Sequence, residues 1–137
     1  MFKTSGGKYV APQLIENAMK QSSFIEQILV VGDGEKMPAA LIQPNWEWVK
    51  EWSSRTGHNI SQDTAIASKG EKLIDRIREE INIHNGGFGN WEKVKTFQLT
   101  PDLWSIEAGH LTPTMKSKRK VIKEMYKDLY EKLYGRS

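Results

Sequence analysis

The sequence predicts a single α+β domain in which helices pack on a small, mostly antiparallel sheet. Two short apolar runs separated by a glycine-containing turn indicate a pair of strands, and several apolar stripes at helical spacing indicate about four helices. The chain has 137 residues, of which 38% are hydrophobic, and this is enough to bury one core. No repeat or long linker divides it, so we expect residues 1–137 to form one domain.

The first helix is predicted at residues 12–20. Pro12 suits a first helical turn, where its missing N–H would have no partner. Ile15, Ala18 and Met19 follow at i, i+3 and i+4, which places them on one face.

A β-hairpin is predicted next, because the apolar runs at residues 28–31 and 39–42 flank a Gly-Asp-Gly turn. Asn45 can then cap a second helix, in which Trp48, Val49 and Trp52 share one face.

Residues 55–70 are polar and predict a loop with one short helical piece. A clear helical stripe follows, and residues 85–87 (NGG) are expected to end it through a left-handed glycine. Alternating apolar residues predict strands at residues 94–99 and 104–108. From residue 118 onward, a broad apolar stripe predicts the last helix.

The composition limits the classes of function. The chain has no cysteine, so disulfides and thiolate metal sites are excluded, and no apolar run approaches membrane-spanning length. We therefore expect a cytoplasmic protein. The net charge is +3, but the segment from Lys116 to the end carries +5, which leaves −2 for the remainder. Such a basic segment is either a solvated helix face or a surface for phosphate or nucleic acid.

Common catalytic constellations are not found in the sequence. His58, His84 and His110 lie far apart, show no metal-ligand spacing and are each predicted to be surface or turn residues. Residues 86–89 (GGFG) follow a helix and lack the GK[ST] ending of a phosphate loop. A cluster of four tryptophans could stack nucleic-acid bases, but their helical spacing favours packing in the core. The four are Trp46, Trp48, Trp52 and Trp91.

Two lysine-bearing loops stand apart from this background. Residues 3–10 (KTSGGKYV) place two glycines between lysines just before a helix, where backbone N–H groups can approach a ligand closely. Residues 109–120 (GHLTPTMKSKRK) lead directly into the basic terminal helix.

These loops resemble the two motifs that bracket the C-terminal domain of long-chain fatty-acid–CoA ligases, members of the adenylate-forming, AMP-binding enzymes. Residues 4–16 (TSGGKYVAPQLIE) resemble the loop and helix after the interdomain hinge, and residues 111–122 (LTPTMKSKRKVI) resemble the terminal lysine motif. Residues 89–94 (GNWEKV) and 106–109 (IEAG) also fit, in the family's order. His110 and Ser117 depart from it, since less polar residues are expected there.

The resemblance implies that the two loops of a mobile lid act in different steps of the reaction. Lys116 would be the catalytic lysine of acyl-adenylate formation, and Gly6, Gly7 and Lys8 would line the CoA channel during thioester formation. The parent enzyme would use fatty acid, ATP, Mg and CoA, whose main sites lie on a large N-terminal domain outside this chain. This domain would hold no metal or cofactor by itself, would be inactive alone, and would contact the N-terminal domain. The parent could also touch a membrane peripherally.

Two alternatives come from other classes of protein. A nucleic-acid-binding module would use the basic terminal helix and would show affinity that falls steeply with salt. A protein-interaction domain would bind another chain. Neither requires four ligase-like motifs in order, so no nucleic-acid partner is expected.

Overall fold

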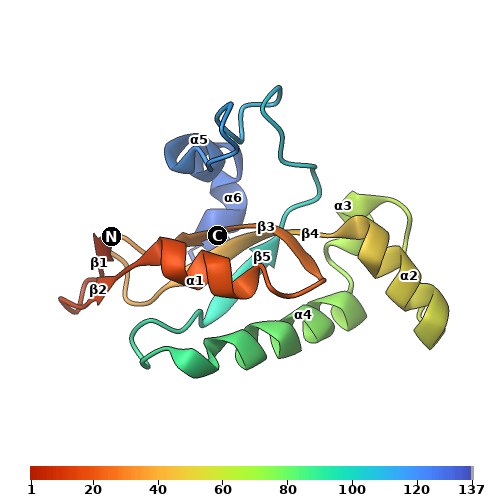
Figure 1. Ribbon diagram of the computed structural model, residues 1–137, viewed down its shortest axis with the longest axis horizontal. Helices are drawn as coiled ribbons and strands as arrows, with labels where there is room; N and C mark the ends of the chain where they lie inside the picture. The colour runs from red at the N-terminus through yellow and green to blue at the C-terminus, as the bar shows by residue number, and fades with distance from the viewer. Residues whose placement is uncertain (137) are drawn as a thin grey trace.

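The computed structural model, which describes residues 1–136, confirms an α+β architecture with a mostly antiparallel strand arrangement (Figure 1). The main sheet has the order β3-β4-β5, with β3 (Ile25–Val31) antiparallel to β4 (Ala39–Pro44) and β4 parallel to β5 (Thr96–Leu99). A second, two-stranded antiparallel sheet joins β1 (Phe2–Lys3) to β2 (Tyr9–Val10). These two short strands were not predicted, because two-residue strands leave no periodic pattern.

The hairpin predicted from the two apolar runs is confirmed, and helices cover both of its faces. Ile28 and Ile42 point into one core, whereas Leu29 and Leu41 point into another. A strand buried on both faces needs apolar residues at consecutive positions, which explains why these runs do not alternate.

The first core lies between the sheet and the helices α1, α2 and α4, and the second lies between the sheet and the helices α5 and α6 (Figure 1). The short α3 precedes α4. The helices are α1 (Pro12–Met19), α2 (Trp46–Thr56), α3 (Thr64–Ala67), α4 (Glu71–His84), α5 (Arg119–Met125) and α6 (Lys127–Leu133).

Local signals explain the helix ends of the first half. α1 begins at Pro12, as predicted, and buries Ile15 and Met19 completely. α2 begins after Asn45, whose side-chain oxygen accepts the N–H of Trp48 at 3.1 Å. α2 ends at Gly57, which takes the left-handed conformation with φ 76°.

The end of α4 differs from the predicted left-handed glycine stop. The helix continues into a 3-10 turn, η1 (Asn85–Gly87), and neither glycine there has a positive φ. The Asn85 side chain ends the helix instead, because its amide bonds both the N–H and the C=O of Val94, at 3.0 and 3.1 Å. The side-chain pairing of a buried asparagine, rather than glycine flexibility, turns the chain towards β5.

The strand predicted at residues 104–108 is wrong. Trp104 is buried, but Ile106 is 40% exposed and the segment forms turns. The backbone N–H of Trp104 donates to the side-chain oxygen of Gln43 in β4 at 2.8 Å. This side-chain bond, and not strand pairing, holds the segment against the sheet. One buried tryptophan followed by small and exposed residues imitated the alternation of a strand.

The predicted terminal helix is present but broken at Tyr126, which separates α5 from α6. Tyr126 has φ −112° and ψ 39°, outside the helical region. Its buried hydroxyl is bonded to His110 and Asp102, and this attachment accompanies the change of direction. The C-terminal end is tied back to the β3–β4 turn by Arg136, which donates to both oxygens of Glu35 at 2.9 Å.

Candidate functional site

The loop between β1 and β2 is a closed turn that carries Gly6, Gly7 and Lys8. Thr4, which is buried, donates its N–H to the C=O of Lys8 at 2.9 Å, and Gly7 donates its N–H to the C=O of Thr4 at 2.9 Å. Gly7 has φ 84°, a conformation that favours glycine. The two glycines and Lys8 are exposed, so their backbone and the lysine ammonium face solvent.

Lys116 lies on a second closed turn, within the connection from β5 to α5. Leu111 and Ser117 form an isolated antiparallel bridge at its base, and the N–H of Thr112 donates to the C=O of Lys116 at 2.8 Å. Met115 has φ 68°, the only positive φ of a non-glycine residue among residues 1–136. The Lys116 side chain is exposed, with no ion pair or cation–π contact among the described residues.

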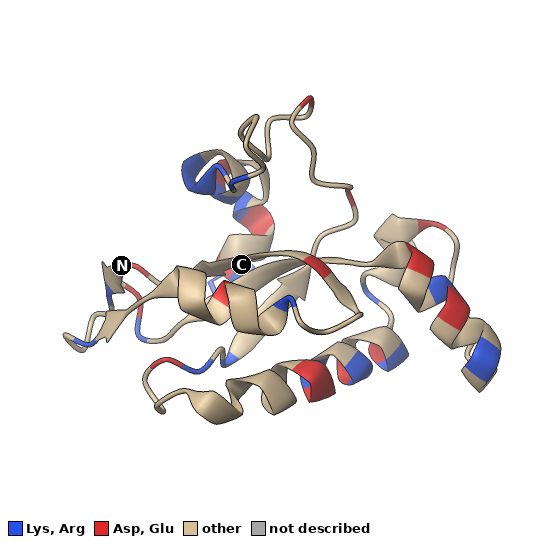
Figure 2. Cartoon of the chain, in the orientation of Figure 1, with Lys and Arg blue, Asp and Glu red and all other residues tan. Residues whose placement is uncertain are grey.

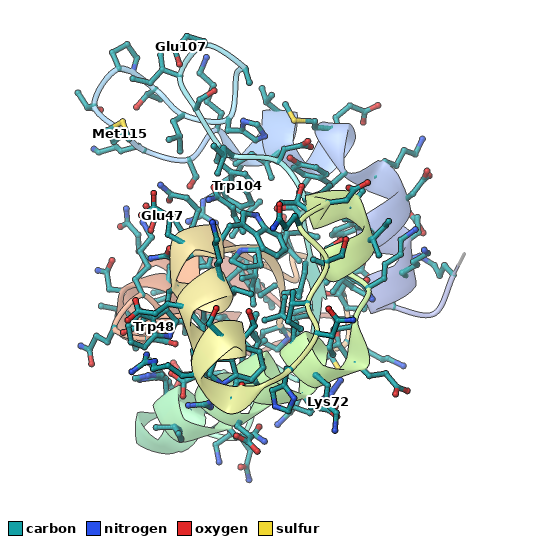
Figure 3. All side chains as sticks on the ribbon, turned by 90° about the vertical axis from the view of Figure 1, so that its right-hand side faces the viewer. Glu47, Trp48, Lys72, Trp104, Glu107 and Met115 are labelled. Carbon is teal, nitrogen blue, oxygen red and sulfur yellow. The ribbon has the colours of Figure 1, made fainter. Side chains whose placement is uncertain are left out.

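The Lys116 turn extends away from the body of the domain. Figure 3 shows Glu107 and Met115 on the outlying part of this connection, with Trp104 at its base. In Figure 1 the β1–β2 loop lies at the left edge and the β5–α5 connection at the top, so the structure does not bring the two lysine loops into one site. Each loop presents a separate exposed surface.

A buried network that was not predicted supports the base of the Lys116 turn. His110 is 1% exposed, so its expected surface position is wrong. The Ser105 N–H donates to His110 Nδ1 at 3.2 Å, which leaves the ring proton on Nε2, where it faces the Tyr126 hydroxyl at 2.9 Å. The Tyr126 hydroxyl in turn donates to Asp102 at 3.0 Å. The C=O of His110 accepts the N–H of Lys118, which closes the far side of the turn.

Burial sets the protonation states in this network. It lowers the pKa of His110 from its ordinary value of 6.5, although the Asp102 carboxylate acts in the opposite direction. Burial also raises the pKa of Tyr126, and the hydrogen bond to Asp102 adds to that effect. His110 and Tyr126 are therefore both neutral at pH 7, so the imidazole faces a neutral hydroxyl, and that hydroxyl donates to Asp102.

A partly buried ion pair joins the two helices that follow the lysine loops. Arg119, at the start of α5, donates to both carboxylate oxygens of Glu16 in α1, at 2.8 and 3.1 Å. Glu16 also accepts the N–H of Val30 at 2.8 Å, and Arg119 donates to the C=O of Val30 at 3.2 Å. The Glu16 side chain is only 8% exposed, so both partners are needed to satisfy its charge.

Other sequence expectations have mixed outcomes. Trp46, Trp48 and Trp52 pack against the first core as predicted, whereas Trp91 is 49% exposed. Lysine and arginine cover much of α5, where the sequence placed the basic segment (Figure 2). No three His, Cys, Asp or Glu side chains within residues 1–136 are grouped so as to hold a metal ion. In the same part of the chain, no helix combines the length and apolarity needed to cross a bilayer.

Comparison with known proteins decides the family. The model of the AMP-binding enzyme C-terminal domain matches residues 2–137. The chain belongs to this family. Among curated relatives, this AMP-binding C-terminal domain is 33% identical to fatty acyl-CoA synthetase B of Dictyostelium discoideum, with 99% of the chain and 20% of the relative covered. It is 31% identical to the long-chain-fatty-acid–CoA ligase FadD15 of Mycobacterium tuberculosis (97% and 22% covered) and 33% identical to human long-chain-fatty-acid–CoA ligase 6 (98% and 20% covered).

The AMP-binding C-terminal domain thus spans about a fifth of the curated relatives it matches. Solved structures agree with the fold. The adenylation domain of a Mycobacterium chelonae carboxylate reductase superposes with a TM-score of 0.78 at 22% identity, covering 97% of this chain and 19% of that one. An adenylation and carrier-protein didomain of a Segniliparus rugosus carboxylic acid reductase, in complex with AMP, gives 0.76 at 24% identity, covering 97% and 17%.

Proposed function

We propose that this chain is the mobile C-terminal domain of a long-chain fatty-acid–CoA ligase. It would supply Lys116 for acyl-adenylate formation and the Gly6, Gly7 and Lys8 loop for thioester formation. The observation that carries the proposal is the match over almost the whole chain, together with an exposed Lys116 on a turn that extends from the body. In this proposal the partner is the N-terminal domain of the same enzyme, and the parent could contact a membrane peripherally.

The chemistry of the first step explains the need for Lys116. A fatty-acid carboxylate attacks the α-phosphate of ATP and pyrophosphate leaves, so two anionic groups meet. An ammonium that bridges them stabilises the charge that accumulates in the transition state. The long, flexible lysine side chain carries a compact charge, which suits a group delivered from an outlying turn. In this proposal the magnesium of the parent enzyme would be bound by the N-terminal domain.

In the second step, the same domain would turn its other loop towards the bound adenylate. Gly6 and Gly7 have no side chains, and they would leave room for the pantetheine arm of CoA beside Lys8. The domain alone would then be inactive, because it carries one part of each half-reaction and the substrate sites lie elsewhere.

The test uses an intact ligase that carries this sequence as its C-terminal domain. Lys116→Ala should lower pyrophosphate release by about 100-fold or more, as does removal of one positioned donor from other transition states. Thioester formation from preformed acyl adenylate should be retained, and the neighbouring exposed Lys120→Ala should change neither step. Equal loss in both half-reactions would reject the role of Lys116.

A further inference from the structure

The two lysine loops share three hydrogen bonds at equivalent positions. In residues 4–8 and in residues 112–116, the threonine N–H donates to the lysine C=O, at 2.9 and 2.8 Å. The residue before the lysine donates its N–H to the threonine C=O, at 2.9 and 2.8 Å. The lysine N–H donates to the threonine hydroxyl, at 3.2 and 3.0 Å. Each loop is therefore one hydrogen-bonded unit in which a threonine fixes the backbone of the lysine four residues later.

The backbone conformation before each lysine is also shared. Gly7 has φ 84° and Met115 has φ 68°, so both are left-handed. A turn followed by a left-handed residue is the usual three-residue hairpin loop, and glycine is the usual choice there. Methionine in this conformation costs about 1–2 kcal/mol. The Lys116 turn keeps the geometry of the Lys8 loop in spite of that cost, and such strain is typical of functional loops.

We propose that Lys8 is the second-step counterpart of Lys116, a phosphate-binding group for thioester formation, and that Thr4 and Thr112 are the positioning residues of the two lysines. This inference rests on the proposed function and deepens it by giving Lys8 a ligand. The shared unit fixes the backbone of each lysine in the same way, so each lysine side chain leaves its loop from an equivalent backbone position.

The second half-reaction supplies a phosphate for Lys8 to bind. The CoA thiol releases its proton to solvent water, and its sulfur forms a bond to the acyl carbonyl carbon. The bond from that carbon to the phosphate oxygen of AMP breaks, and AMP leaves with the electron pair. Negative charge therefore grows on a phosphate oxygen, and CoA brings phosphates of its own. A positioned ammonium stabilises either group through charge-assisted hydrogen bonds.

The surroundings of the two lysines differ in the conformation seen here. Lys8 Nζ lies 5.6 Å from the centroid of the Trp91 ring, an exposed indole that holds the cation by a cation–π contact. Lys116 has no such contact among the described residues. The indole holds Lys8 at the surface by a weak attraction, which a phosphate would replace at little cost.

The experiment measures each half-reaction separately in the intact ligase. Lys8→Met and Thr4→Val should each lower thioester formation from preformed acyl adenylate by about 10-fold or more, the effect of one charge-assisted bond, and leave pyrophosphate release at its wild-type rate. Thr112→Val should have the opposite pattern. Thr4→Ser and Thr112→Ser keep the hydroxyl and should restore each step, and the exposed Lys69→Met should affect neither.

Replacing CoA with pantetheine, which has no nucleotide phosphates, identifies the source of the phosphate. A loss that persists with pantetheine assigns Lys8 to the AMP phosphate, and a loss seen only with CoA assigns it to the phosphates of CoA. Wild-type thioester formation by Lys8→Met would overturn the inference, and so would failure of serine to rescue either valine variant. If Lys116→Ala still blocks pyrophosphate release in that case, the proposed function stands and only the inference fails.

Discussion

Arg119 and Glu16 form a bidentate ion pair that links the first residue of α5 to α1, with nitrogen–oxygen distances of 2.8 and 3.1 Å. The two residues are far apart in sequence, and each lies in the helix that follows one of the lysine loops. The pair therefore fixes the start of α5, which follows the Lys116 turn directly, against the helix that follows the Lys8 loop.

Arg119→Ala should destabilise the domain, because it leaves the Glu16 carboxylate buried with only the Val30 N–H as a partner. We expect a loss of about 2–3 kcal/mol in the free energy of unfolding, less than for a fully buried pair because Arg119 is partly exposed. Denaturant unfolding followed by circular dichroism measures it. The adjacent exposed Lys120→Ala is the matched control, and equal stability of both variants would show that the pair contributes nothing.

Gly7 and Gly6 should respond differently to the same substitution. Gly7→Ala forces a side chain into φ 84° and should cost about 1 kcal/mol of unfolding free energy. Gly6→Ala meets nothing closer than the Thr4 hydroxyl oxygen at 4.0 Å, so its effect should stay within about 0.5 kcal/mol. Thermal unfolding of the two variants makes the comparison. A loss in Gly6→Ala as large as that in Gly7→Ala would contradict the left-handed conformation as the cause.

His110 should make the stability of the domain dependent on pH. Its pKa in the folded state is lowered from 6.5 by burial, so the unfolded state binds the proton more readily. The contribution is fully present above pH 6.5 and falls as the pH drops towards the folded-state pKa. His110→Gln removes the titrating group, so its unfolding free energy should decline less than that of the wild type below pH 6.5. Parallel curves for the two proteins would exclude His110 as the source.

The chain by itself should bind ATP negligibly, because in the proposed function it supplies one lysine to a site built by another domain. Isothermal titration calorimetry with ATP should show no saturable heat. The basic residues of α5 should likewise give no tight nucleic-acid complex, and filter binding at two salt concentrations checks this. Tight binding of RNA with a steep salt dependence would instead favour a nucleic-acid-binding module.

Periodicity predicted the elements whose stability depends on a single apolar face or a local cap. α1, α2 and α4 and the hairpin of β3 and β4 were of this kind. The prediction failed where distant side chains determine the conformation: Gln43 holds Trp104 in a segment without strand pairing, and Tyr126 interrupts the last helix. Nothing local in the sequence reports those contacts.

The site was predictable only in part. Lys116, Gly6, Gly7 and Lys8 came from resemblance to a family, and the structure shows all four exposed on closed turns. His110 was misplaced, because the partner of its ring, Tyr126, lies sixteen positions further along the chain. The threonines were overlooked, although each stands four residues before its lysine, and that shared spacing was the available signal.

The parallel pairing of β4 with β5 has a consequence for the order in which the domain folds. The antiparallel hairpin joins neighbouring segments, whereas β5 can add to β4 only after α2, α3 and α4 have carried the chain back across the sheet. Pairings between distant segments carry a larger loop-closure cost and form later. The amide protons of the hairpin should therefore become protected from exchange before those of β5. The outlying lysine turn, which follows β5, would then be among the last parts of the domain to take its final shape.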